Sequence, residues 1–574
     1  MFIPTTTQEL TALGWDRLDI ILVSGDTYID SPLIGSAVIG KVLINAGYRV
    51  GIIAQPDIRN GNDITRLGEP RLFWGVTAGS VDSMVANFTS TRKRRRRDDY
   101  TPGGLNNRRP NRASMVYTNL IRQHYKDTVP IVLGGLEASL RRIAHYDYWS
   151  DSVRASLLVD SKADFILYGM AEQSVLALAQ ALRDRQQPRS IRGLCYLSRH
   201  PVDGYLELPP YETARDDQRA LIEMFHLFYR NNDPINANGL VQRHGDRYLV
   251  QNPPAPLPDQ AQLDAIFNLD YERAQHPYYE KQGAAPALET IRFSITTHRG
   301  CYGECNFCAI AVHEGCTVYW RSTESILTEV ERMTRHPQFK GIIQDLGGPT
   351  ANMYGFECAK KLRNGICPEK RCLFPQTCSQ LKIDHSPQVA LLRRVRAIPA
   401  VRKVFVASGI RYDMVLADQR SGKTYLREIA SHHTSGQLKI APEHSEDHLL
   451  KAMGKPAINS VLDFKNLFDQ YSREAGKKQY LTYYFIAAYP GCSEADMERL
   501  RRFASLKLKI HPEQVQIFTP TPSTYSSLAY YTETDPFTGE KILVEKEMGR
   551  KERQKRVLTA AKNGSTRNNA QHGR

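Results

Sequence analysis

Short apolar runs that end in glycine and pass directly into helix-like sequence recur along most of this chain. The first run covers residues 20–23, an amphipathic stretch covers 36–45, and a second apolar run follows at 50–54. This order is typical of a βαβ unit, in which a crossover helix returns the chain to a parallel strand. Since parallel strands are buried on both faces, their continuous apolar runs predict an α/β fold.

The N-terminal half repeats this unit several times. Its next strand candidates lie in "LFWGVTAG", "VPIVLGGLEASL" and "ADFILYGMAE". We therefore expect a doubly wound parallel sheet in an N-terminal domain over residues 1–280, with any ligand at the carboxyl ends of its strands. The Pro-rich stretch "QNPPAPLPDQAQ", which begins at Gln251, predicts a linker at the end of this domain, because Pro cannot continue a helix or a central strand.

A second series of βα units begins near Glu289 and predicts a separate domain over residues 285–530. Its six strand candidates lie in "TIRFSITTHRGC", "GIIQDLGGP", "KVFVASGIRYD", "GQLKIAPEH", "YLTYYFIAAYPG" and "QVQIFTPTP". Six units indicate a partial (β/α)6 barrel, whose reactive groups would lie on the loops after the strands. The remaining residues, 531–574, form a basic C-terminal extension that we expect to be disordered at its end.

The formal net charge of +15 is concentrated in two segments. Residues 91–112 contain nine Lys or Arg and two Asp, and residues 546–574 contain nine Lys or Arg and two Glu, so that each segment carries +7. A run such as "RKRRRR" at 92–97 usually forms a solvated, self-repelling loop. Phosphate contact with a nucleic acid is the alternative, but no aromatic residues are interleaved to stack on bases. We therefore expect a solvated loop here.

The sequence opposes both secretion and membrane insertion. The stretch "MFIPTTTQELTALGWD" lacks the basic start and apolar core of a secretory signal, and no apolar run approaches the roughly 20 residues of a transmembrane helix. We expect a cytoplasmic protein with no membrane partner. In that compartment the ten cysteines are reduced thiols or metal ligands rather than disulfides.

Three cysteines follow the first predicted barrel strand. The stretch "HRGCYGECNFCAI" places Cys301, Cys305 and Cys308 in a C-x3-C-x2-C array. A structural zinc ion takes four ligands, commonly from paired C-x2-C units, and only one such unit is present. A [4Fe–4S] cluster held by three thiolates keeps one iron open to a substrate or cofactor. The array therefore favours an open cluster, with a zinc loop or three unrelated thiols as the alternatives.

This array, with Phe307 before the last cysteine, resembles the signature of radical S-adenosylmethionine enzymes. The phrases "GYRVGIIAQPD", "GGPTANMYGFEC" and "FTPTPSTYSSLAYYTETDPFTG" narrow the resemblance to the YgiQ family, up to about residue 545. The resemblance implies that the open iron binds S-adenosylmethionine and that reductive cleavage of this cofactor starts radical chemistry on a substrate that the sequence does not identify. It also implies an electron donor such as flavodoxin or ferredoxin. No residue is singled out as the one that quenches a product radical.

The resemblance assigns cofactor contacts to the ends of later strands. Gly347 and Gly348 stand where the superfamily often carries a Gly-Gly-Glu-like segment that receives the amino group of S-adenosylmethionine. Pro349 replaces the acid, so Asp345 or backbone carbonyls would supply this contact, and a simple strand-to-loop turn is the alternative. The candidates for contacts with the ribose and the carboxylate group, with helix capping as the alternative, are Ser408, Arg411 and Glu443.

The N-terminal domain of the YgiQ family is related in appearance to the cobalamin-binding domains of other radical enzymes. Domains with a histidine-ligated cobalamin carry D-x-H-x-x-G after the first strand, whereas here Asp26 is followed by "TYIDS" at 27–31. The histidine and the glycine are both missing. Cobalamin without histidine ligation could still bind over "LGGLEAS" and "LYGMAE", but the missing ligand favours a domain that holds no cofactor.

A second group of cysteines lies in the insert 358–378, "CAKKLRNGICPEKRCLFPQTC". Its four thiols could hold zinc or an auxiliary iron–sulfur cluster, since the insert has little apolar sequence from which to form a core. Their spacing matches no common zinc pattern, and reduced thiols without a metal are the alternative. Cys195, Cys316 and Cys492 are interpreted as ordinary thiols. The second group consists of Cys358, Cys367, Cys372 and Cys378.

Three functions are consistent with these residues. The favoured one is a radical S-adenosylmethionine enzyme whose substrate is unidentified. A narrower alternative is methyl or methylthio transfer to RNA or to a protein, motivated by the cobalamin-like domain, the second group of cysteines and the basic segments. A different alternative is a non-catalytic iron–sulfur binding module that never cleaves the cofactor.

Overall fold

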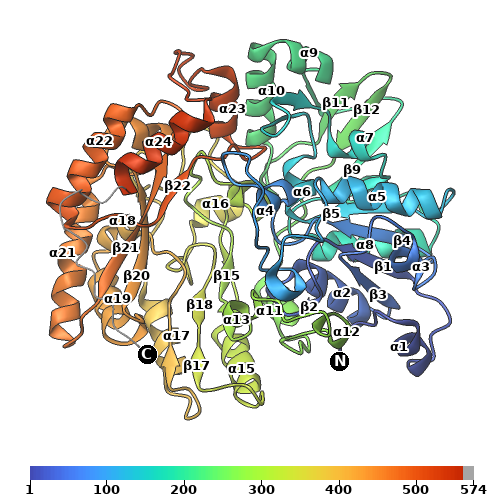
Figure 1. Cartoon of the computed structure of the whole chain (residues 1–574), viewed down its shortest axis with the longest axis horizontal. Coiled ribbons are helices and arrows are strands. Elements are labelled where there is room, and N and C mark those ends of the chain that lie inside the picture. Colours follow the sequence, from blue (N-terminus) through green and yellow to red (C-terminus); the bar gives the residue numbers. More distant parts are fainter. Residues whose placement is uncertain (560–574) are drawn as a thin grey trace, which may run out of the picture.

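The structure, a computed structural model, describes residues 1–559 and consists of two α/β units that lie side by side (Figure 1). The disorder expected at the C-terminal end falls on residues 560–574, which lie outside the described residues. In the described part of the chain, no helix is both long enough and apolar enough to cross a membrane.

A nine-stranded sheet forms the centre of the N-terminal unit. Its five consecutive parallel strands are β8 (Phe165–Leu167), β5 (Ile131–Gly134), β4 (Phe73–Thr77), β1 (Ile20–Ser24) and β3 (Val50–Ala54). Helices that follow these strands in the sequence also cover the sheet, among them α2 (Gly35–Asn45), α5 (Ala113–His124) and α8 (Glu172–Arg183). The prediction of a doubly wound parallel sheet is confirmed for this part of the unit.

The sheet continues beyond β8 with four strands that the sequence analysis did not predict. These are β9 (Leu194–Ser198), β12 (Arg247–Gln251), β11 (Leu240–His244) and β10 (Leu206–Leu208). The pairings β8–β9, β9–β12 and β12–β11 are antiparallel. Gly245, at φ +61°, permits the two-residue turn that joins β11 to β12. The Pro-rich stretch leaves the sheet directly after β12 and leads toward the second unit.

The second unit is the predicted partial barrel. Its strands are β14 (Ser294–Thr296), β17 with β18 (Ile342–Ile343 and Asp345–Gly347), β19 (Lys403–Val404), β20 (Gln437–Glu443), β21 (Tyr480–Ala487) and β22 (Val515–Ile517). They pair in chain order and in parallel, with a parallel bridge between Ile410 and Ile440 that connects the third strand to the fourth. The outer helices include α15 (Thr323–Thr334), α17 (Ser386–Arg396), α21 (Asn459–Glu474) and α22 (Glu494–Phe503).

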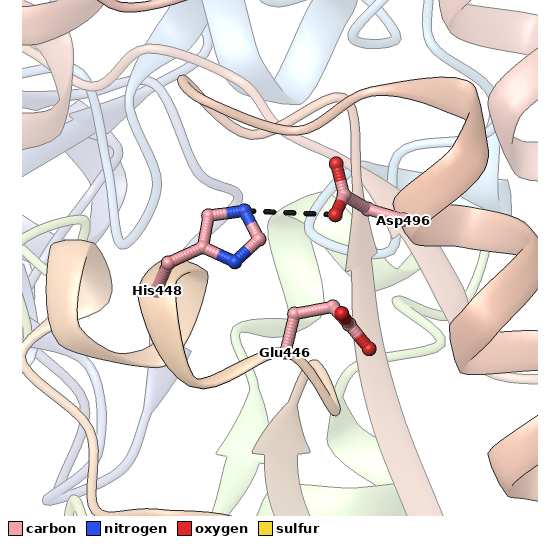
Figure 2. A group of neighbouring side chains, drawn as sticks. All are labelled: Glu446, His448 and Asp496. Carbon is pink, nitrogen blue, oxygen red and sulfur yellow. Dashed lines mark ion pairs between the residues drawn. The ribbon is translucent and has the colours of Figure 1, made fainter.

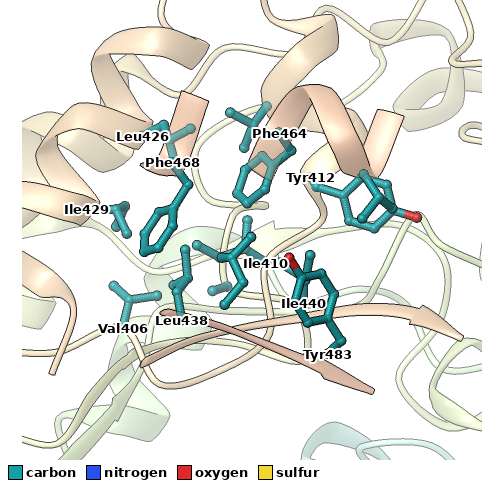
Figure 3. Packing of buried hydrophobic residues seen from close by; sticks show 14 of the residues in the cluster. Val406, Ile410, Tyr412, Leu426, Ile429, Leu438, Ile440, Phe464, Phe468 and Tyr483 are labelled. Carbon is teal, nitrogen blue, oxygen red and sulfur yellow. The ribbon is translucent and has the colours of Figure 1, made fainter. Parts of the chain in front are cut away.

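The main core of the barrel lies between its strands and α21 (Figure 3). Val461, Phe464 and Phe468 recur at helical spacing on α21 and belong to the same buried cluster as Ile410 and Leu438. Each of these side chains is almost completely buried. Burial of a side chain of this kind contributes about 1.5–3 kcal/mol to the free energy of folding. This core fixes the strand ends from which the candidate site is built.

The two units are held together by the loop that follows α4 (Ser83–Asn87) and by the C-terminal helix α24 (Met548–Thr559). Ser90 in this loop donates from its Oγ to the carbonyl of Ile517 in β22, at 2.9 Å. On α24, the Lys551 ammonium donates to the hydroxyl of Tyr148 in the N-terminal unit at 3.3 Å, and the helix packs against β22. The loop and the helix therefore cover the side of the barrel next to its last strand (Figure 1).

Candidate functional site

The three cysteines of the C-x3-C-x2-C array share one loop at the carboxyl end of the first barrel strand. The loop lies between β15 (His298–Arg299) and α14 (Ile310–His313). Cys308 donates its backbone N–H to the carbonyl of Cys305 at 2.9 Å. The Sγ of Cys301 lies 3.5 Å from the hydroxyl of Thr350, within hydrogen-bond distance. The structure thus brings the three thiols together where strand-end loops of a barrel carry reactive groups.

The sulfur atoms of these cysteines lie close enough to influence one another. Burial raises the pKa of the Cys301 and Cys308 thiols, and the neighbouring Cys305 sulfur raises both further. Thiols with raised pKa values stay neutral unless a positive charge compensates the thiolates. A bound metal centre supplies that compensation, because it stabilises the thiolates that coordinate it. The electrostatics of the loop therefore fit a metal centre.

The three sulfurs can be compared with the ligand sets of zinc and of a [4Fe–4S] cluster. Zinc bound to thiolates at about 2.3 Å holds its sulfur ligands about 4 Å from one another. Within the described residues, the sulfurs of Cys301, Cys305 and Cys308 do not all lie within 4.8 Å of one another. A [4Fe–4S] cluster distributes its ligands over separate irons and accepts a wider spacing. A closed zinc site would need a fourth ligand in addition to these three thiols, whereas the open cluster needs none.

Arg411 lies beside the cysteine loop. Its Nη1 is 3.7 Å from the Sγ of Cys305, while its Nε and Nη2 bind the carboxylate of Asp413 at 2.8 and 2.5 Å. Asn352 fixes the backbone here, accepting from the Arg411 N–H at 2.8 Å and donating to its carbonyl at 3.0 Å. A Cβ on Gly303 would lie 3.2 Å from the guanidinium, so a glycine at this position allows the close approach.

Three other predicted cofactor contacts, Gly347, Gly348 and Ser408, lie together in the lining of one cavity. Ser408 donates from its Oγ to the carboxylate of Asp345, and its backbone N–H donates to the same carboxylate at 3.2 Å. A Cβ on Gly348 would lie 2.6 Å from the Nε2 of His298, so only glycine fits this contact. Gly347, Gly348 and Ser408 line one cavity together with Asp345 and His298.

Glu443 lies apart from these three residues. It adopts φ +70°, its carboxylate is buried 3.7 Å from the Nζ of Lys455, and burial raises its pKa. It lines another cavity, which also contains Phe307 of the cysteine loop. Of the five predicted cofactor contacts, three therefore line the first cavity, Glu443 lines the second, and Arg411 lies beside the thiols. They are divided in this way because their strand ends face different sides of the barrel mouth.

The first cavity, which we call the sheet cavity, has a volume of about 540 Å³. It starts at the carboxyl ends of the parallel strands and continues between the sheet and helices α2 and α8. Its deep part is lined by Leu22, Val38, Phe73, Val132 and Val175. Protein interiors are close-packed, so an apolar cavity of this size is suited to a bulky apolar group. Sequence reasoning placed a ligand at the strand ends but did not predict this extension beneath them.

Asp26 lies at the mouth of the sheet cavity, where the cobalamin motif would begin. Its Oδ1 is 2.8 Å from the Nη2 of Arg109, which is also 3.0 Å from the Oδ2 of Asp98. The side chains of all three residues are at most 3% exposed. Arg109 belongs to the first basic segment, so part of the charge of that segment has a structural role and is not available to a partner.

The second cavity, which we call the barrel cavity, has a volume of about 900 Å³. Its inner part contains Phe307 and Glu443, together with Tyr484 from β21. Its outer part is lined by the loop that follows α4 and by α24. Sequence reasoning considered phosphate contact as an alternative for the first of these segments, but it placed neither segment at a barrel cavity.

The cysteine-rich insert lines a third cavity, of about 990 Å³. Cys316, which sequence reasoning treated as an ordinary thiol, joins it there. Lys361 connects two of these cysteines, since its Nζ lies 3.8 Å from the Cys372 Sγ and 2.8 Å from the Cys316 carbonyl. Among the described residues, no three of these sulfurs lie within 4.8 Å of one another. The lining includes all four predicted members, Cys358, Cys367, Cys372 and Cys378.

Glu446, His448 and Asp496 form the only group of three metal-ligating side chains in the described residues whose ligand atoms lie within 4.8 Å of one another (Figure 2). Arg499 already neutralises this group, with its Nε 2.6 Å from the Glu446 carboxylate and its Nη2 in contact with that of Asp496. Asp496 also accepts the N–H of Ser493 in the capping box of α22, at 2.8 Å. The group is therefore an ion-pair and capping network.

Buried histidines predict a fall in stability in mild acid. Burial lowers the pKa of His145 and of His444 to about 3, against about 6.5 in an unfolded chain. Below pH 6.5 the unfolded state therefore binds more protons, and each histidine lowers the free energy of unfolding by about 1.4 kcal/mol per pH unit. We expect a loss of about 3 kcal/mol between pH 7.5 and 5.5 from this pair, measured by urea unfolding.

His444→Gln tests the histidine assignment. Glutamine can accept the N–H of Glu446 as the His444 ring does at 3.2 Å, but it does not titrate. The fall between pH 7.5 and 5.5 should be smaller in this variant by about 1.4 kcal/mol, the share of one histidine. An undiminished fall would show that other groups cause the acid sensitivity.

Comparison with known proteins gives a consistent match over the whole chain. The "Radical SAM N-terminal" family matches residues 2–294. A UPF0313 protein of Fusobacterium nucleatum subsp. nucleatum is 54% identical over 97% of this chain and 98% of its own length. UPF0313 proteins of Thermotoga maritima and Methanocella arvoryzae are 48% and 47% identical, over 98% and 97% of this chain and 99% and 92% of their own lengths.

Two solved structures can be aligned with this chain. The radical S-adenosylmethionine methyltransferase TsrM from Kitasatospora setae aligns with a TM-score of 0.49 at 14% identity, over 88% of this chain and 74% of that one. The cobalamin-dependent S-adenosylmethionine radical enzyme OxsB aligns with a TM-score of 0.48 at 11% identity, over 89% of this chain and 55% of that one.

Proposed function

Because this chain belongs to the UPF0313, or YgiQ, family of radical S-adenosylmethionine proteins, we propose that Cys301, Cys305 and Cys308 hold a [4Fe–4S] cluster that binds this cofactor. When bound, the cluster and S-adenosylmethionine supply reductive cleavage of the sulfonium and an organic radical that acts on a substrate not yet identified. The observation that carries this proposal is the group of three partly buried thiols on one strand-end loop, with the Cys305 sulfur beside the Arg411 guanidinium.

The side chains around the thiols prepare the site. The Arg411 guanidinium lies 3.7 Å from the Cys305 sulfur and offers a fixed positive charge to thiolate ligands. Its pairing with Asp413 holds that charge in place. Residues that contact the ligands of a metal centre orient those ligands and tune the reduction potential of the centre. Arg411 therefore favours the electron-rich state that reductive cleavage requires.

The two cavities flank the place proposed for the cofactor. Backbone groups of Gly347 and Gly348 and the Asp345–Ser408 pair would receive the polar groups of S-adenosylmethionine on one side. Glu443 would contact it on the other side, where the residue also faces the barrel cavity. A soluble one-electron donor such as flavodoxin or ferredoxin would supply the electron.

Anaerobic reconstitution tests the proposed function. Protein rebuilt with iron and sulfide, mixed with S-adenosylmethionine and dithionite, should release 5′-deoxyadenosine. Binding of the cofactor without any cleavage under these conditions would instead support a non-catalytic iron–sulfur module. Metal analysis of the same sample should give about four irons per chain, or about eight if the cysteine-rich insert holds an auxiliary cluster. Zinc in the same analysis would show a metal-bound insert without extra iron, and neither metal beyond the first four irons would leave its cysteines as reduced thiols.

Methyl transfer is a second candidate, and the sheet cavity favours it. Cobalamin carries methyl groups, and the cavity offers an apolar space at the strand ends where such domains bind ligands. The lower histidine ligand is missing, so a bound cobalamin would be held without it. This candidate therefore depends on the cavity and not on the motif.

Filling the sheet cavity tests this candidate. Val175→Trp should lower the binding of hydroxocobalamin at least tenfold, because an indole would occupy the deep part of the cavity. Ala177→Trp, on the exposed face of the same helix α8, is the matched control and should bind as the parent does. The measurement is the absorbance of cobalamin retained on ultrafiltration. No retention by the parent protein would show that the domain holds no cobalamin.

A further inference from the structure

Two basic segments that are more than 400 residues apart in the sequence meet at the mouth of the barrel cavity. The loop that follows α4 contributes Lys93 and Arg95 to the lining, and α24 contributes Lys555 and Arg556. We call these four residues the basic rim. Each comes from one of the two segments of net charge +7, so the fold concentrates at one opening a charge that the sequence divides between its two ends.

Specific contacts hold the two segments together. Thr91 donates from its Oγ1 to the Glu552 carboxylate at 3.1 Å, and the Lys93 ammonium lies 2.6 Å from the same oxygen. Ser90 anchors the loop to the carbonyl of Ile517 in β22. Among the described residues, Glu552 is the only acidic one in the outer lining of the cavity, and these contacts already engage it.

The other cations of the rim are available to a partner. Arg95 is exposed, and its Nε donates to the carbonyls of Val85 and Phe88, at 3.1 and 3.0 Å, which fixes the guanidinium without neutralising it. Within residues 1–559, Arg95, Lys555 and Arg556 form no ion pair with a carboxylate. Like charges held together without acidic partners attract anions.

The interior of the cavity has a different character. Phe307 and Tyr484 line it, and both are only partly buried, so their rings can contact a ligand. Phe307 stands between Cys305 and Cys308 in the cysteine loop. The cavity therefore connects a basic rim at the surface with aromatic side chains next to the proposed cluster.

We propose that the substrate is a single-stranded nucleic acid, whose phosphates contact the basic rim while one base enters the barrel cavity. This proposal rests on the proposed function, since the reaction would take place at the cluster beyond Phe307. Cations that follow the backbone together with aromatic faces for the bases are the features by which proteins bind single strands. An acidic protein would use the rim but would not require the aromatic interior, and a membrane surface would not enter the cavity.

The structure changes the interpretation of the arginine-rich run. The sequence favoured a solvated loop because no aromatic residues are interleaved with the arginines. The aromatic residues at the cavity come instead from the cysteine loop and from β21. The arginine-rich run, the cysteine loop and β21 come together only in the folded chain.

Binding of a labelled single-stranded RNA of about 20 nucleotides to the reconstituted holoprotein tests the proposal. We expect the dissociation constant to rise steeply with salt. The triple variant Arg95→Gln, Lys555→Gln, Arg556→Gln should bind at least tenfold more weakly and reduce the slope of log K against log salt by about 2. A control with equal charge loss at exposed residues outside the cavities is Lys126→Gln, Arg199→Gln, Lys423→Gln, and its binding should match the parent.

Three outcomes would overturn the proposal. The first is no RNA binding at low salt by holoprotein that does cleave S-adenosylmethionine, which would refute the nucleic-acid substrate and leave the proposed function intact. The second is an equal loss of binding in the two triple variants, which would show non-specific attraction. The third is binding of polyglutamate or of phosphatidylserine vesicles as tight as that of RNA and equally dependent on the rim. Absence of cleavage in every preparation would instead refute the proposed function.

Discussion

Replacement of Cys301, Cys305 and Cys308 together by alanine should remove the iron–sulfur cluster and reduce the release of 5′-deoxyadenosine to the level of a protein-free mixture. Three thiolates are the whole protein contribution to the proposed cluster, so no partial site remains. We expect iron to fall by about four atoms per chain and reductive cleavage to fall at least a thousandfold, measured by iron analysis and by chromatography of the nucleoside products.

A matched thiol removal controls this experiment. Cys195 is fully buried in strand β9 of the N-terminal unit, far in the sequence from the cysteine loop. Cys195→Ala should keep both the iron and the cleavage activity. Full iron content and undiminished cleavage in the triple variant would refute the assignment of the three ligands. A loss of about half the iron with unchanged cleavage would indicate that the cysteine-rich insert holds the catalytic cluster.

The second large effect concerns the buried ion-pair group at the mouth of the sheet cavity, formed by Asp26, Asp98 and Arg109. Arg109→Met leaves the carboxylates of Asp26 and Asp98 buried without their cation. Breaking a buried pair in this way costs about 3–5 kcal/mol, since the remaining charges stay desolvated. We expect the urea midpoint of the N-terminal unit to fall accordingly, measured by the fluorescence of the buried Trp74.

Two further variants separate charge from packing. Arg108→Met changes the exposed neighbour of Arg109 and should alter stability by no more than about 0.5 kcal/mol. Adding Asp26→Asn and Asp98→Asn to Arg109→Met removes the orphaned charges and should recover part of the lost stability. A midpoint that does not move in Arg109→Met would mean that the ion pairs contribute nothing to the fold.

Local patterns were sufficient to predict most of the architecture. The apolar runs at 20–23 and 50–54 became β1 and β3, because a buried parallel strand needs apolar side chains on both faces. The antiparallel strands β9 to β12 were missed, since their short runs carry polar residues and their order in the sheet depends on a hairpin and not on crossover helices. The six barrel units were predicted because each strand precedes a helix in the same way.

The candidate site could be predicted only where it is local in sequence. Cys301, Cys305 and Cys308 lie within eight residues, so their spacing alone indicated a cluster. The distribution of Ser408 and Glu443 between two cavities depends on how strand ends face one another in the barrel, which no short pattern encodes. The basic rim is the extreme case, because its members come from opposite ends of the chain.

The contact of Ser90 with Ile517 has a consequence for the integrity of the barrel. Strand β22 pairs with β21 on one side only, so its other side would present free backbone groups to solvent. Exposed strands of this kind invite pairing with other chains. The N-terminal unit shields this strand with the loop after α4, and a barrel expressed without that unit would lose both its shield and half of its basic rim. We therefore expect an excised barrel to self-associate.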